Sequence, residues 1–182
     1  MKSGIRRENR TFAELIAVAA AIGGKKGKLS ESSLRRGLKV FFPTAVKVLC
    51  AFEIAGALGE RKGRNFAFRA DGTAVFGDKG GEREDYFPLA ETDADFAEVG
   101  FKGYLTGTLL PAIKIGITYG SLSVVFLERK MSVGYERARE VYDLIAAAGL
   151  LGGDDEINPG RKLMRLTPSE YDALYERVTF RK

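Results

Sequence analysis

The chain has 182 residues, of which 45% are hydrophobic and 29% are charged, and its formal net charge is +5. This composition is typical of a globular protein with one ordinary domain or two small ones. With no histidine and a single cysteine, Cys50, the sequence lacks the residues of a zinc site, a histidine-activated nucleophile or an internal disulfide. We therefore expect no enzyme activity, no catalytic residues, no metal and no cofactor, and a buried structural role for Cys50.

The apolar stretch at residues 12–24 is interrupted by Glu14 and is too short to cross a bilayer, which takes about 20 residues. The basic N-terminus is not followed by the small-residue cleavage site of a signal peptide. These features predict a cytoplasmic protein with no membrane partner.

Positive charge is concentrated in the first half of the chain. Residues 1–80 contain 16 Lys/Arg and 7 Asp/Glu, residues 81–102 contain 2 and 7, and residues 103–182 contain 11 and 10. A basic segment of this kind indicates a surface for nucleic acid or another polyanion, although a solvated basic face has the same composition.

An internal repeat relates residues 29–59 to residues 122–152 without a gap, at an offset of 93 residues. The copies are identical at eleven positions and share a Gly-x-Leu-Gly ending, and the identical pairs include Leu34/Leu127, Val48/Val141 and Gly56/Gly149. Repeats of this kind indicate two units with the same fold.

The first copy predicts a helix over residues 11–23, then a short helix, a turn and a longer helix in which Pro43 occupies the first turn. The apolar residues of the longer helix recur at helical spacing, and Gly56 is suited to stop it. Residues 60–65 read as the tip of a β-hairpin, and residues 66–68 as its returning strand.

The second copy predicts the same order of elements. A helix at roughly residues 105–119 is limited by Pro111, and helices at 124–130 and 135–148 flank a turn. Residues 152–159 form the loop of the hairpin and residues 160–166 its return. A C-terminal helix, residues 168–178, starts from a capping box of Thr167 and Glu170.

Helix–turn–helix followed by a hairpin is the winged-helix arrangement, so the predicted class is α+β, mainly α, with tandem winged-helix domains. We expect domain 1 at residues 1–80, an acidic linker or insertion at 81–103, and domain 2 at 104–182. The third helix and the hairpin of both units are expected to lie exposed on one side of the molecule.

The second copy resembles the gamma domain of the FtsK/SpoIIIE DNA translocases, a winged helix that reads short G-rich sequences. The resemblance rests on Leu-Glu-Arg at 127–129, Val-Gly-Tyr-Glu-Arg-Ala-Arg at 133–139, Asp143, Gly-Leu-Leu-Gly at 149–152 and Pro-Gly-Arg-Lys at 159–162. It covers about residues 112–166 and implies double-stranded DNA as the partner and a nucleoid-associated location. Glu136 and Glu140 stand where the family has Asn and Arg, and the motor domain of the family has no counterpart in the chain.

A winged helix places its third helix in the major groove and its hairpin on phosphates. The expected DNA-binding residues of the first copy are Arg35, Arg36, Lys39, Thr44, Lys47, Arg61, Lys62 and Arg64. Those of the second copy are Arg129, Lys130, Ser132, Glu136, Arg137, Arg139, Arg161 and Lys162. The aromatic residues Phe41, Phe42 and Tyr135 are expected to pack in the core.

Two function classes remain open at this point. The first is a free-standing DNA-binding protein of a mobile element, of replication or of regulation, and tandem winged helices of plasmid replication initiators look similar at a coarse level. The second is a protein-interaction module, as in the kleisin-binding subunits of condensation complexes. The basic first half favours DNA, whereas Glu136 and Glu140 favour a protein partner or a homodimer through the second copy.

Overall fold

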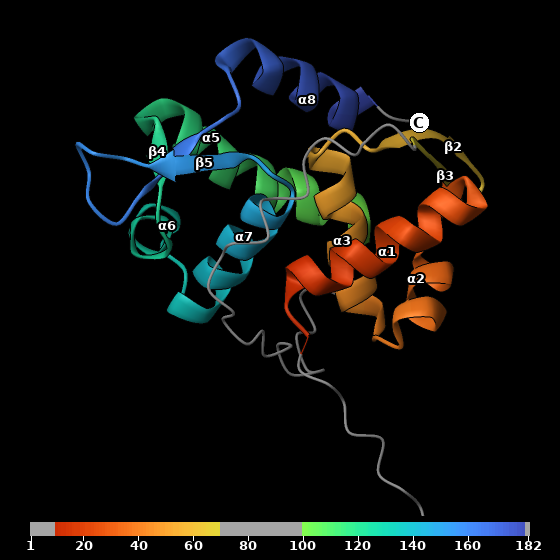
Figure 1. Cartoon of the computed structure of the whole chain (residues 1–182). Helices are drawn as coiled ribbons and strands as arrows, with labels where there is room; N and C mark the ends of the chain where they lie inside the picture. Colours follow the sequence, from red (N-terminus) through yellow and green to blue (C-terminus); the bar gives the residue numbers. More distant parts are fainter. Residues whose placement is uncertain (1–9, 70–99, 181–182) are drawn as a thin grey trace, which may run out of the picture.

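A computed structural model of the chain describes residues 10–69 and 100–180. The described residues form a mainly helical α+β structure with two small antiparallel sheets, as the sequence predicts (Figure 1). Among these residues, no helix has the length and apolar character needed to cross a membrane. Most of the predicted acidic linker lies outside the described residues.

The first unit consists of three helices and a three-stranded sheet with strand order β1-β3-β2. Its elements are α1 (Phe12–Lys26), β1 (Lys28–Leu29), α2 (Glu31–Leu38), α3 (Phe42–Ile54), β2 (Leu58–Lys62) and β3 (Asn65–Phe68). The capping box of Thr11 and Glu14 starts α1, and Ser30 and Ser33 form another at α2. Antiparallel pairing joins β1 to β3 and β3 to β2, so the hairpin is held against the start of α2.

The second unit repeats this order and adds a helix at its end. Residues 100–104 are helical and continue into the π-helix η2 (Leu105–Leu109). The other elements are α5 (Leu110–Tyr119), β4 (Ser121–Leu122), α6 (Val124–Met131), α7 (Tyr135–Ala147), β5 (Leu151–Asp154), β6 (Lys162–Met164) and α8 (Pro168–Phe180). The sheet has the order β4-β6-β5.

The offset of 93 residues relates the structures of the two units as well as their sequences. Helices α2 and α3 shifted by this offset coincide with the bounds of α6 and α7. The residue that ends the shorter helix is left-handed in both units, with φ 55° at Lys39 and 53° at Ser132. The glycines predicted to stop the longer helices, Gly56 and Gly149, have φ values of 77° and 79°. The repeated order of elements predicted from the sequence is therefore present in the structure.

Several predicted boundaries are corrected by the structure: α1 extends to Lys26, and β5 includes residues 152–154 of the predicted second hairpin loop. Residues 100–103, assigned to the linker, are helical and belong to the second unit. Pro111 does not limit the helix; the preceding turn widens so that the Leu110 amide donates to the Leu105 carbonyl, which accommodates a proline that lacks a donor. The tip of the first hairpin is shorter than predicted, because β2 extends to Lys62 and only Gly63 and Arg64 form the turn.

The two units are joined by their third helices. Helix α3 packs against α7 near the centre of the molecule, and α1 also contacts α7 (Figure 1). The sheets lie on opposite sides of this pair of helices (Figure 1). The prediction that the third helices and hairpins lie exposed on one side is therefore wrong, because the helices pack on each other and the hairpins point to different sides.

Candidate nucleic-acid interface

A buried ion pair stands at the contact between α3 and α7. The Lys47 ammonium pairs with the Glu140 carboxylate, and both side chains are 3% exposed. The two residues occupy equivalent positions of the repeat, since 93 residues separate them. Contact between equivalent positions is what a local two-fold axis produces. Lys47 therefore joins the units, and its predicted role in DNA binding is wrong because its ammonium is enclosed.

A second ionic contact between the units lies at the C-terminal end of α3. Arg177 of α8 donates from Nη2 to the Glu53 backbone carbonyl at 2.7 Å, and its Nε is 3.8 Å from the Glu53 carboxylate. The Glu53 side chain is fully buried, and the buried Cys50 thiol lies one turn earlier. Burial, with the nearby Glu53 carboxylate, raises the pKa of this thiol, which fits the structural role expected from the sequence.

Beyond its first turn, helix α3 has almost no exposed surface. All residues from Ala45 to Ile54 are buried, and Thr44, a predicted DNA contact, is half-buried. The burial of α3 could have been predicted from its composition. Lys47 and Glu53 are its only charged residues, and a helix that is apolar on all sides is normally buried. The first unit therefore cannot place α3 in a DNA groove.

The other predicted contacts of the first unit are exposed cations on α2 and the β2–β3 hairpin. They are Arg35, Arg36, Lys39, Arg61, Lys62 and Arg64. Arg35 is 3.4 Å from Glu31, and Arg61 donates to the Gly63 carbonyl at 3.0 Å while its guanidinium lies over the Phe66 ring. The pair between Lys62 and Glu60 spans 4.0 Å at the surface and contributes little. These cations remain accessible to a polyanion.

Sequence reasoning missed four further exposed cations of the first unit: Lys25, Lys26, Lys28 and Arg69. The first two end α1, Lys28 lies in β1, and Arg69 follows β3. Three of them fall within the Gly-Lys-rich segment at residues 24–28, whose clustered lysines are the sequence signal for this part of the surface. Residues 10–69 contain 12 Lys/Arg and 4 Asp/Glu, so the surface of this unit is strongly positive.

In the second unit, the predicted contacts at the turn before α7 and in its first turns differ in exposure. Ser132 and Glu136 are exposed, whereas Arg137 and Arg139 are half-buried. Arg139 is 3.9 Å from Asp143, one turn later in the helix. Tyr135 is 46% exposed, and Phe41 and Phe42 at the start of α3 are 42% and 36% exposed, so the prediction that these rings belong to the core is wrong.

The remaining predicted cations of the second unit lie on α6 and its hairpin. The Arg161 guanidinium lies 3.8 Å from the centroid of the Phe126 ring, and Lys130 donates to the Tyr119 hydroxyl at 2.8 Å. Lys162 is 2.6 Å from Asp154 in a surface pair, and Arg129 is exposed at the end of α6. Among the described residues, this unit presents fewer exposed cations than the first.

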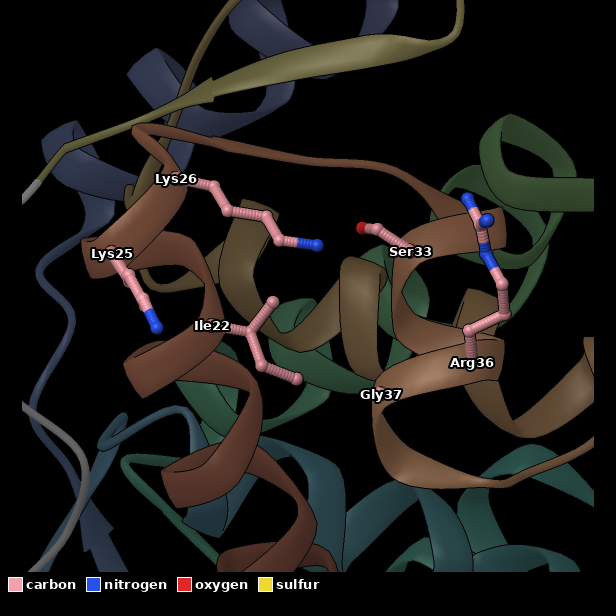
Figure 2. A pocket seen from close by; sticks show the side chains of 6 residues that line it. All are labelled: Ile22, Lys25, Lys26, Ser33, Arg36 and Gly37. Atoms are coloured by element: carbon pink, nitrogen blue, oxygen red, sulfur yellow. The ribbon is translucent and has the colours of Figure 1, made fainter.

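A hollow of about 480 Å³ opens between the end of α1 and helix α2 of the first unit. Its lining residues are Ile22, Lys25, Lys26, Ser33, Arg36 and Gly37 (Figure 2).

Comparison with family models, curated proteins and solved structures gave no match. Among the described residues, no cluster of acidic or sulfur side chains could hold a metal ion.

The loop of the second hairpin is ordered by one carboxylate. Asp155 accepts hydrogen bonds from the amides of Ile157 and Asn158 at 3.0 and 3.2 Å, and from the Asn158 side chain at 2.9 Å. The nearby Ser121 side chain and the hydrogen bonds from Asn158 lower the pKa of Asp155 to about 2. This loop leads into Arg161 and β6, so its order fixes where the hairpin presents its cations.

We expect the hairpin loop to loosen in acid. The pKa of Asp155 is about 2 in the folded chain and about 3.9 when unfolded, so the ionised group stabilises the loop above pH ~4. That contribution is lost as the pH falls from about 4 towards 2. The protection of the Ile157 and Asn158 amides, measured as the exchange rate of an unstructured amide divided by the observed rate at the same pH, should fall over this range, and at pH 7 in an Asp155→Ala variant. Equal protection in variant and parent at pH 7 would contradict this role.

Proposed function

We propose that the chain binds double-stranded DNA through phosphate contacts made by its first unit. The observation that carries this proposal is the excess of exposed cations on that unit, on α2, on the β2–β3 hairpin and around the end of α1. Arg35 and Lys62 each have a carboxylate neighbour, but only in weak surface pairs. A polyanion that replaces these partners gains several charge contacts at once.

The order of elements supports a winged-helix interpretation of both units. In each, a helix, a short strand and two helices precede a hairpin, and the first strand pairs with the second strand of the hairpin. The β2–β3 hairpin is then the wing of the first unit, and α3 is the helix that a winged helix normally places in the major groove. Because α3 is buried, the proposed contacts are to phosphates, which position the protein without reading sequence.

The proposal predicts a strong dependence of binding on salt. Fluorescence polarisation with a labelled random duplex should give a log–log slope of about −0.9 for each phosphate contact. An Arg61→Ala/Arg64→Ala variant should flatten the slope by up to about 1.8, because two contacts are lost. A Lys102→Ala/Arg165→Ala variant removes the same charge from the exposed surface of the second unit and should leave the slope nearly unchanged.

Two results would overturn the proposal. One is the absence of duplex binding at low salt; the other is an equal loss in both double variants, which would reflect net charge alone. A G-rich duplex of the same length tests the resemblance of the second copy to the gamma domain. Preferential binding of that duplex would indicate base contacts by Ser132 in the turn before α7 and by Glu136 in its first turn.

A protein-interaction module is the second candidate, and two observations favour it. The packing of α3 on α7 uses the helices that otherwise read DNA, and Phe41, Phe42 and Tyr135 remain exposed beside them. Exposed aromatic rings are enriched at protein interfaces. A chain that binds no duplex, but whose Phe41→Ser/Phe42→Ser variant loses a partner or its self-association, would establish this function instead.

A further inference from the structure

The hollow between α1 and α2 is lined by cations and by no carboxylate. Lys26 extends across it towards Ser33, whereas Lys25 and Arg36 project from its rim (Figure 2). The Ser33 hydroxyl already donates to the Ser30 carbonyl at 2.9 Å, so the positive side chains supply the attraction for a ligand. Ile22 and Gly37 form the apolar part of the lining. A hollow of this size and charge suits an anionic group attached to an organic moiety.

The second unit shows that this hollow is a property of particular residues and not of the fold. At the offset of 93, Lys26, Ser33 and Gly37 correspond to Tyr119, Phe126 and Lys130. In the second unit these three side chains occupy the equivalent place. The Tyr119 and Phe126 rings pack edge to face with centroids 5.1 Å apart, and Lys130 bonds the Tyr119 hydroxyl at 2.8 Å. Smaller side chains at two of the three positions leave the space open in the first unit.

Gly37 contributes to the hollow by its lack of a side chain. A Cβ at this position would clash with Cδ1 of Ile22, so a larger residue here would displace the end of the Ile22 side chain. Glycine inside a helix is less stable than alanine. Its presence therefore leaves room for the Ile22 side chain beside an open, positively charged space.

We propose that this hollow holds a phosphate group, with the Lys26 ammonium as its main contact and Arg36 and Lys25 as rim cations. A multiply charged oxyanion matches the charge of the lining, and lysine is a common phosphate ligand. The phosphate belongs either to a nucleic-acid backbone or to a free phosphorylated compound. In the first case the inference deepens the proposed function, on which it then rests, by naming where one backbone phosphate is bound.

The test fills the hollow with the side chains that the second unit uses. Isothermal titration of the full chain with pyrophosphate and with ADP is compared for the parent, Lys26→Ala and Lys26→Tyr/Ser33→Phe. Lys62→Ala is the matched control, because it also removes one positive charge from the first unit but lies on the hairpin. Duplex affinity of the same proteins is measured by polarisation, and circular dichroism checks the fold. If Lys26→Tyr/Ser33→Phe, the filled variant, is unfolded, the comparison rests on Lys26→Ala.

We expect Lys26→Ala and the filled variant to weaken pyrophosphate binding at least tenfold, and Lys62→Ala to change it less than twofold. If duplex DNA competes with pyrophosphate for the hollow, the natural ligand is a phosphate of the nucleic-acid backbone. If ADP competes and duplex DNA does not, the ligand is a free phosphorylated compound. The absence of pyrophosphate binding, or equal losses in all three variants, overturns the inference. If the inference fails in this way, salt-dependent duplex binding can still persist, and the proposed function then stands. If instead the chain binds pyrophosphate but no duplex DNA, only the proposed function is overturned.

Discussion

The Lys47→Met variant is expected to lose about 3–5 kcal/mol of the free energy of unfolding. Lys47 and Glu140 are each 3% exposed, so removal of the ammonium leaves the carboxylate enclosed between the two units without its lysine. Breaking a buried pair from one side costs more than the pair contributes, because the remaining charge is desolvated. Urea denaturation followed by circular dichroism measures the change.

Removal of both charges provides the control for this prediction. A Lys47→Met/Glu140→Leu variant should recover most of the lost stability, since apolar side chains of similar volume often replace a buried pair without loss. Arg35→Ala breaks a pair at the surface and should cost less than about 1 kcal/mol. A single Lys47→Met variant as stable as the parent would show that solvent reaches this contact.

The second large effect is expected at the end of α3. Arg177→Met should lower the free energy of unfolding by about 2–3 kcal/mol, a value reduced from that of a fully buried pair because the arginine is 38% exposed. In this variant a long apolar side chain still occupies the position, but the contacts of the guanidinium with the Glu53 carbonyl and carboxylate are lost. Thermal and urea denaturation measure the loss.

Two further variants separate charge from geometry at this contact. Arg177→Lys keeps the charge but lacks the planar guanidinium, and should lie between Arg177→Met and the parent. Arg165→Met changes another exposed arginine of the second unit and should alter stability by less than about 0.5 kcal/mol. The prediction fails if Arg177→Met and Arg165→Met have the same effect.

The repeat allowed most of the fold to be predicted from the sequence. Left-handed glycines, serine and threonine caps and the alternation of helix and strand are local features, so their signals lie within a few residues. The capping box of Thr167 and Glu170 illustrates this: both hydrogen bonds of the box are present, at 2.7 and 3.3 Å, at the predicted start of α8.

The packing of one unit on the other could not be predicted in the same way. Lys47 was interpreted as a DNA contact because it lies early in the third helix, but its exposure depends on α7, a helix 93 residues later. The hollow likewise depends on how closely α1 approaches α2 at Gly37, a distance that sequence spacing does not specify. The sequence shows which side chains are charged or apolar, but which of them are exposed to solvent depends on tertiary contacts.

The equivalence of Lys47 and Glu140 has a consequence for assembly. If two first units associated through their α3 helices in the same symmetric manner, two ammonium groups would meet in an enclosed space, and two second units would bring together two carboxylates. Like charges in such surroundings repel strongly. Only a mixed pair, one first unit with one second unit, is attracted, so this contact disfavours homotypic dimers of either half.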